Sequence, residues 1–136
     1  MWMSFSIKGL CMELNDVQKK YIDEKLKLLS FSKFRSSFHL RKYMRIYIED
    51  KGWDIIEMHC AEFIEKNLSK YPILNDGRQT PMKNHPVFIA QHATATCCRK
   101  CIFKWYKIPN NRELTDKEKK FIKALIMEWL KREYFS

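Results

Sequence analysis

Every proline and glycine of this chain lies at the end of a stretch with helical periodicity or between two such stretches, and this placement constrains the fold more than any other feature. Proline removes a backbone donor and clashes with the preceding turn, and glycine lowers helix stability, so these residues mark where helices begin and end. The residues are Gly9, Gly52, Pro72, Gly77, Pro81, Pro86 and Pro109. The chain is therefore divided into a series of helical segments.

Three helices are expected in the first half of the chain, because apolar residues recur there every three or four positions. They span about residues 16–29, 39–51 and 53–68, and the second ends at Gly52. Asp16 is the expected N-cap of the first helix, since its carboxylate can accept a hydrogen bond from a free N–H group of the first turn.

Two short helices and one long helix are expected in the second half. Pro86 suits the first position of a helix through His92, and Thr96 is expected to cap a helix over residues 97–107. The last helix opens with residues 115–118, Thr-Asp-Lys-Glu, which match a capping box. Its expected core stripe consists of Phe121, Ile122, Leu125, Ile126, Trp129 and Leu130.

These segments predict a single all-α domain over residues 1–136, with five or six helices and a long ordered loop before the segment rich in His and Cys. Residues 1–14 alternate in part like a strand but have no partner strand, so we expect an N-terminal arm. No apolar stretch has the length of a signal peptide or a membrane span, which predicts a cytoplasmic protein without a membrane segment.

The number of cysteines and the expected compartment determine how the thiols are interpreted. The chain has five cysteines, an odd number, and cytoplasmic thiols stay reduced. We therefore interpret them as core residues, metal ligands or nucleophiles rather than as a disulfide framework. They are Cys11, Cys60, Cys97, Cys98 and Cys101.

The formal net charge of +10 suggests a nucleic-acid partner, because Lys and Arg gain affinity for phosphate by counterion release. Residues 97–136 hold 11 basic and 5 acidic side chains, and thus supply +6 of this charge. The expected contact residues are Arg99, Lys100, Lys104, Lys107 and the aromatic Trp105. The alternative is a compositional bias, since 19 of the 26 basic residues are Lys rather than Arg.

The strongest candidate for chemistry is the segment over residues 85–101, which contains five potential N or S ligands of a metal ion. They are His85, His92, Cys97, Cys98 and Cys101. The two histidines are separated by almost two helical turns, and Cys101 can share a helix face with either preceding cysteine. A fold at residues 93–96 would bring both groups around one Zn²⁺, which prefers four such ligands.

Two other interpretations of this segment stay open. Its cysteines also fit a buried helix stripe, and reduced cysteine is one of the most buried residue types. Alternatively, Cys97 in the first turn of a helix, with Arg99 nearby and a His as base, would be a catalytic nucleophile with a lowered thiol pKa. His59 is expected to be a core histidine. The alternative is that it serves as a further metal ligand.

The loop over residues 70–84 has turn chemistry at Asn75-Asp-Gly77. A loop of this length in a small domain is often functional, so Asp76, Arg78 and Gln79 are candidates for an anion site or a lid. An ordinary turn is the alternative.

Two sequence runs resemble a family of small prokaryotic proteins known only as a domain of unknown function. The runs are NDGRQTPM at residues 75–82 and HPVF-x-AQHATATCCR at residues 85–99, where x is any residue, within a resemblance that extends over about residues 34–129. The resemblance implies no activity, but it directs attention to the same histidines and cysteines. Members of this family usually have His where this chain has Tyr106, so no ligand or base is expected at that position.

Overall fold

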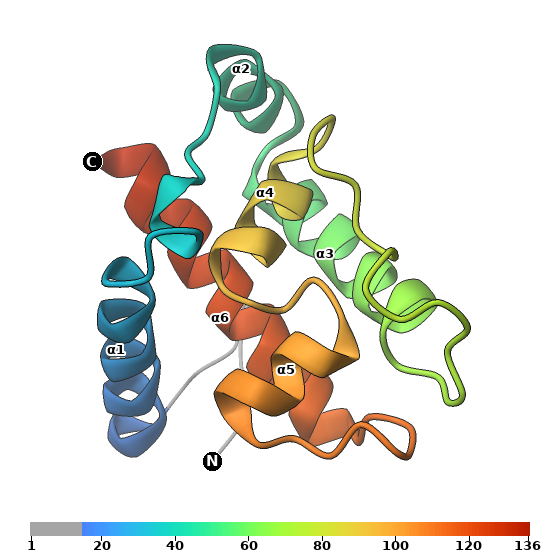
Figure 1. Ribbon diagram of the computed structural model, residues 1–136. Helices are drawn as coiled ribbons and strands as arrows, with labels where there is room; N and C mark the ends of the chain where they lie inside the picture. The colour runs from blue at the N-terminus through green and yellow to red at the C-terminus, as the bar shows by residue number, and fades with distance from the viewer. Residues whose placement is uncertain (1–14) are drawn as a thin grey trace.

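Helices form the regular structure of residues 15–136, the part of the chain that the computed structural model describes (Figure 1). The α-helices are α1 (Asp16–Ser30), α2 (Lys42–Lys51), α3 (Trp53–Asn67), α4 (Pro86–Ala93), α5 (Arg99–Tyr106) and α6 (Asp116–Phe135), and a short 3-10 helix, η2 (Arg35–Ser37), follows α1. The prediction of an all-α domain with five or six helices is confirmed, since these residues form six α-helices and no strand. The predicted arm over residues 1–14 lies outside the described residues.

Helix α6 is the centre of the domain, and it packs most extensively on α3 and α4 (Figure 1). Its buried side chains are Ile122, Leu125, Ile126, Met127 and Leu130. Each such side chain contributes about 1.5–3 kcal/mol when it is removed from water. The predicted capping box is confirmed, because the Thr115 hydroxyl accepts from the Glu118 backbone and the Glu118 carboxylate accepts from the Thr115 backbone. Phe121 and Trp129 lie half-buried against the core.

Helix α1 begins at Asp16 as predicted but has another N-cap, and α2 begins later than predicted. The N-cap of α1 is Asn15 rather than Asp16, because Asn15 and Gln18 form a reciprocal capping box with side-chain to backbone distances of 2.8 and 3.1 Å. Helix α2 begins at Lys42 rather than near His39, because Phe38 after η2 and Arg41, the N-cap of α2, both have extended backbone conformations. The prediction therefore differs from the structure in the cap residue of α1 and in the first three residues expected for the second helix.

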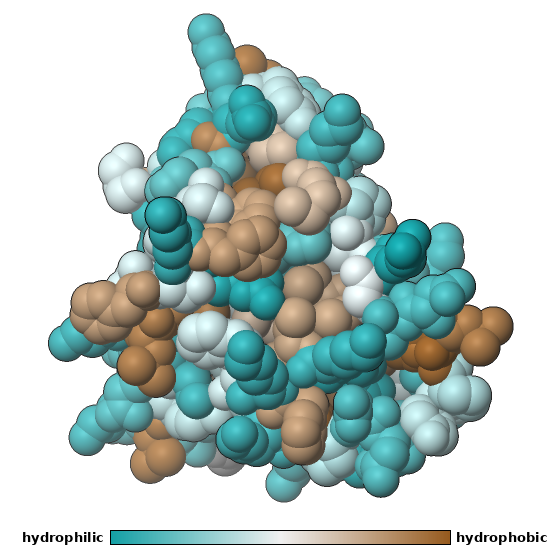
Figure 2. Space-filling model, viewed as in Figure 1, coloured by the Kyte–Doolittle hydropathy of each residue, from teal (hydrophilic) through white to brown (hydrophobic). Residues whose placement is uncertain are grey.

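The surface of the domain is mixed in polarity. On the face seen in Figure 2, hydrophilic and neutral side chains separate the apolar patches. Within the described part of the chain, no helix combines the length and the apolar character that crossing a membrane requires.

Candidate metal centre

The chain reverses direction between α4 and α5, and this corner determines where the cysteines lie. Helix α4 ends when the backbone of Ala95 takes a left-handed conformation with φ of 59°. The Thr96 N–H then donates to the Gln91 carbonyl at 2.8 Å, and the Tyr106 hydroxyl donates to the Thr94 carbonyl. Tyr106 therefore holds this corner from α5.

Helix α5 begins two residues later than the sequence predicts. Its N-cap is Cys98 rather than Thr96, and the Cys98 Sγ accepts from the Cys101 N–H at 3.5 Å. Cys97 consequently precedes the helix instead of lying in its first turn, and Cys101 takes the first-turn position. The predicted helix start at Cys97 is wrong because Thr96 is buried and turned toward the Thr94 hydroxyl, at 3.0 Å.

This local fold brings three thiols together. The sulfur atoms of Cys97, Cys98 and Cys101 all lie within 4.8 Å of one another. Cys97 and Cys98 are buried, whereas Cys101 is partly exposed. The cluster is therefore a group of three soft ligands at the edge of the core.

Arg35 approaches the cluster from a distant part of the sequence. Its Nη2 donates to the Cys101 Sγ at 3.1 Å, while Nη1 lies 3.7 Å from the Cys97 Sγ and donates to the His92 carbonyl at 2.8 Å. Arg35 belongs to η2, which packs on α4. No periodicity or residue spacing in the sequence indicates that this arginine lies beside the cysteines.

The cluster favours one thiolate, on Cys101. Hydrogen bonds from the Cys97 and Cys98 thiols and from Arg35 stabilise that anion and lower the pKa of Cys101. The pKa values of Cys97 and Cys98 are raised, chiefly because each thiol donates to the Cys101 sulfur. In the first turn of α5, Cys101 also benefits from the positive end of the helix dipole.

Neither predicted histidine ligand belongs to this group of mutually close ligand atoms in residues 15–136. His92 is 8% exposed, and its Nε2 lies 3.1 Å from the carbonyl oxygens of both Thr80 and Pro81. Because carbonyl oxygens only accept, Nε2 carries a proton and is not free to bind a metal ion. The His92 ring also stacks on Phe38, with a centroid distance of 5.4 Å.

His85 lies in a separate contact with His59. It is the N-cap of α4, where its Nδ1 accepts from the Val87 N–H at 3.0 Å, and its Nε2 lies 3.0 Å from the His59 Nδ1. With Nδ1 as an acceptor, the neutral His85 ring carries its proton on Nε2 and donates it to His59. Burial, and then the proximity of His59, lowers the pKa of His85 to about 4.

A comparison with models of known families shows the family of this chain. The family model described as "Domain of unknown function (DUF4186)" matches residues 23–131. The chain belongs to the DUF4186 family. The matched range includes Arg35 and the three clustered cysteines, so the cluster lies within the DUF4186 domain. No solved structure shows significant similarity to the chain.

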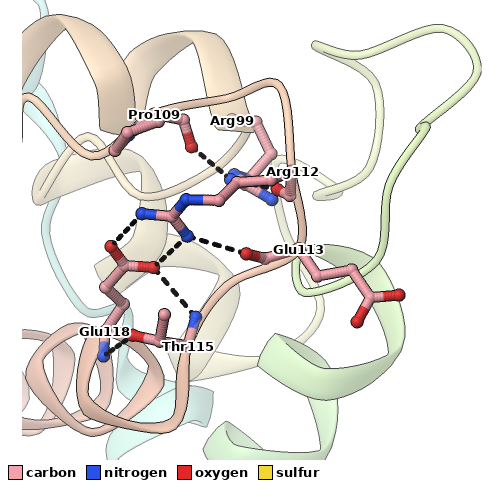
Figure 3. A network of polar contacts seen from close by, with 6 residues as sticks. All are labelled: Arg99, Pro109, Arg112, Glu113, Thr115 and Glu118. Atoms are coloured by element: carbon pink, nitrogen blue, oxygen red, sulfur yellow. Dashed lines mark hydrogen bonds and ion pairs between the residues drawn. The ribbon is translucent and has the colours of Figure 1, made fainter.

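Arg99 of this DUF4186 domain is a buried structural residue, and Figure 3 shows its contacts with the loop before α6. It is 2% exposed, and its guanidinium donates to the backbone carbonyls of Leu68 at 3.1 Å, of Arg112 at 2.9 Å, and of Pro109. The same loop is held by the two ion-pair contacts of Arg112 with Glu118, at 2.9 and 2.7 Å. Arg99 is therefore unavailable for the nucleic-acid contact predicted for it.

The other predicted contact residues have different surroundings. Lys100, Lys104 and Lys107 are exposed on α5 and at its C-terminal end, and Trp105 is partly buried against the core. Phosphate contact by the three lysines stays a prediction, whereas Trp105 offers only part of its ring.

The loop before α4 is fixed against α5. The two carboxylate oxygens of Asp76 accept from the Arg99 and Lys100 N–H groups at 3.0 and 2.9 Å, so Asp76 caps the first turn of α5. Gln79 donates to the same carboxylate, and its Oε1 accepts from the Gly77 N–H at 2.7 Å. Of the three predicted anion or lid residues, Arg78 alone has an exposed side chain, and Asp76 is already engaged as a helix cap.

Proposed function

We propose that this DUF4186 protein binds a thiophilic metal ion through Cys97, Cys98 and Cys101, with Zn²⁺ as the leading candidate. The convergence of the three sulfur atoms within 4.8 Å of one another supports the proposal. A zinc–sulfur bond measures about 2.3 Å, and a tetrahedral site then separates its sulfurs by roughly 3.8 Å. The thiols therefore need to close by at most about one ångström to reach this geometry.

The ligand set also bears on the kind of metal site. Structural zinc sites are closed by four protein ligands, whereas catalytic sites use three and leave the fourth position to solvent or substrate. The His92 Nε2 is occupied by the Thr80 and Pro81 carbonyls, and His85 is occupied by Val87 and His59. A site of three cysteines with an open fourth position is the form that we propose.

Cys98→Ser is the sharpest test of this function. Serine is a preferred N-cap, so its hydroxyl would still cap α5 while one thiolate is lost. We expect protein purified without added metal to contain about one zinc per chain, and Cys98→Ser to lose this metal while retaining its helical circular dichroism.

Cys60→Ala is the matched control, because Cys60 is a buried thiol of α3 outside the cluster. This variant should keep its metal. Metal-free wild-type protein that binds no added Zn²⁺ under reducing conditions would refute the proposal.

A nucleophilic thiol is the second candidate, and the contact of Arg35 with Cys101 favours it. The nucleophile would be Cys101 rather than Cys97, because Cys101 has the guanidinium at 3.1 Å and the first-turn position of α5. Metal-free wild-type protein should then be alkylated fastest at Cys101 at neutral pH. Slow alkylation of Cys101 in metal-free protein would exclude this candidate, and bound metal that blocks alkylation would support the first.

A further inference from the structure

We propose that Arg35 is the counter-charge of the three-cysteine site and makes the site selective for a divalent cation over trivalent arsenic. This inference rests on the proposed metal-binding function and names the class of ion that the site prefers. The observation that supports this inference is that the Arg35 guanidinium contacts two of the three sulfur atoms. Its nitrogen atoms lie 3.1 Å from the Cys101 Sγ and 3.7 Å from the Cys97 Sγ.

Several contacts hold Arg35 in this position. Its backbone N–H donates to the Ser32 hydroxyl at 3.2 Å, its Nη1 donates to the His92 carbonyl at 2.8 Å, and its guanidinium carbon lies 5.0 Å from the centre of the Phe34 ring. The guanidinium is therefore fixed at the cluster before any ion binds. Arginine stays protonated in proteins, so its positive charge is permanent.

The negative charge opposite Arg35 comes from sulfur. Within residues 15–136, the ion pairs of the structure include none between Arg35 and a carboxylate. The buried arginine at the start of α5, Arg99, is directed to three carbonyls. Arg35 is thus the cation that balances the charge of the thiolate group.

The net charge of the complex distinguishes divalent from monovalent ions. A divalent cation binds the Cys101 thiolate and displaces the protons of the other two thiols to solvent, and the resulting complex carries one negative charge, which Arg35 neutralises. A monovalent ion such as Cu⁺ leaves a complex with two negative charges, so one charge stays unbalanced. Since a partly buried net charge is costly, the divalent ion is favoured.

With trivalent arsenic, the charge left without a partner is the positive charge of Arg35. Arsenite, As(OH)₃, takes up one proton and reacts with the two thiols and the Cys101 thiolate to form a neutral trithiolate and three water molecules, with no change in oxidation state. The Arg35 guanidinium then faces uncharged sulfur atoms and loses its anionic partner. The arginine therefore disfavours arsenic without blocking access to the thiols.

One competition experiment measures this selectivity directly. Zn²⁺-loaded protein is titrated with arsenite under reducing conditions, and a chromophoric chelator reports the arsenite concentration that releases half of the zinc. In the exchange, the trithiolate complex, one As(OH)₃ and three protons give the arsenic trithiolate, free Zn²⁺ and three water molecules. We expect Arg35→Gln to lower the half-release concentration by about tenfold or more, the range found when groups that contact metal ligands are removed.

Two further variants complete the design. Arg35→Lys keeps the positive charge and should stay closer to wild type than Arg35→Gln does. Arg78→Gln removes an exposed arginine from the loop before α4 and should leave the titration unchanged. A variant that fails to fold is recognised because it releases zinc before any arsenite is added, and circular dichroism confirms the loss of helix.

The outcomes distinguish this inference from the function on which it rests. A wild-type protein that binds neither Zn²⁺ nor arsenite overturns both. Tight Zn²⁺ binding with the same half-release concentration in wild type and Arg35→Gln overturns the counter-charge role alone. An equal shift in Arg35→Lys and Arg35→Gln also overturns it, because the effect would not depend on charge.

Discussion

Replacing Arg99 by methionine removes a buried guanidinium that joins three segments of the chain. Arg99 donates to the carbonyl of Leu68 at the end of α3. It also donates to the carbonyls of Pro109 and Arg112 in the loop before α6 (Figure 3). Methionine fills a similar volume but donates nothing, so three carbonyls lose their charged donor.

The magnitude follows from these contacts. A hydrogen bond from a charged group contributes about 1.5–3 kcal/mol, and three together would give roughly 4.5–9 kcal/mol if they were additive. The desolvation cost of the buried guanidinium, which methionine avoids, offsets part of this sum, as does rehydration of the loop carbonyls. We therefore expect Arg99→Met to lower the free energy of unfolding by about 3–5 kcal/mol, a large share of the roughly 5–15 kcal/mol typical of a domain.

Urea denaturation followed by far-ultraviolet circular dichroism measures this change. Lys100→Met is the control, because Lys100 is the exposed neighbour of Arg99 on the same helix and its replacement should change the unfolding free energy by at most about 0.5 kcal/mol. A loss below about 1 kcal/mol in Arg99→Met would refute the reasoning, since it would mean that water replaces the guanidinium at little cost.

Two further predictions concern pH and salt. The pKa of His85 is about 4 in the folded protein, below the ordinary value of 6.5, so the unfolded chain binds the proton more readily and stability should fall as the pH drops from about 6.5 to about 4. After allowance for its partial exposure we expect a loss of about 1–2 kcal/mol in urea denaturation across this window. His85→Asn keeps an N-cap residue and should remove most of this pH dependence, and an unchanged dependence would contradict the assignment to His85. Nucleic-acid binding by the exposed lysines should weaken steeply with added salt, and replacing Lys104 and Lys107 by Gln should weaken it further in fluorescence anisotropy; no binding at low salt would exclude this partner.

The helices were predictable because their signals are local. The Thr115 capping box, the apolar stripe of α6 and the break at Gly52 all depend on residues within a few turns of one another. The start of α5 differs by two residues because threonine is a preferred N-cap type and cysteine is not, whereas the structure has Cys98 as the N-cap. The hydrogen bonds that engage the buried Thr96 side chain form only in the folded corner between α4 and α5.

The candidate site was predictable only in part, for the same reason. The three cysteines are neighbours in sequence, so their proximity follows from one turn of chain. The expected convergence of His85 with His92 assumed that both belong to one helix, but His85 is the N-cap with φ of −140°, and its ring is directed to His59 of α3. Arg35 lies 62 residues before Cys97, and only the packing of η2 on α4 brings the two together.

X-ray absorption at the zinc edge tests the central claim most directly, because it counts the sulfur ligands of the bound ion. Wild-type protein loaded with one equivalent of Zn²⁺ should show three sulfur scatterers at about 2.3 Å and one lighter scatterer, and Cys98→Ser should show at most two sulfurs if it binds at all. A zinc shell of nitrogen and oxygen atoms without sulfur, or wild-type protein that binds no zinc, would contradict the account.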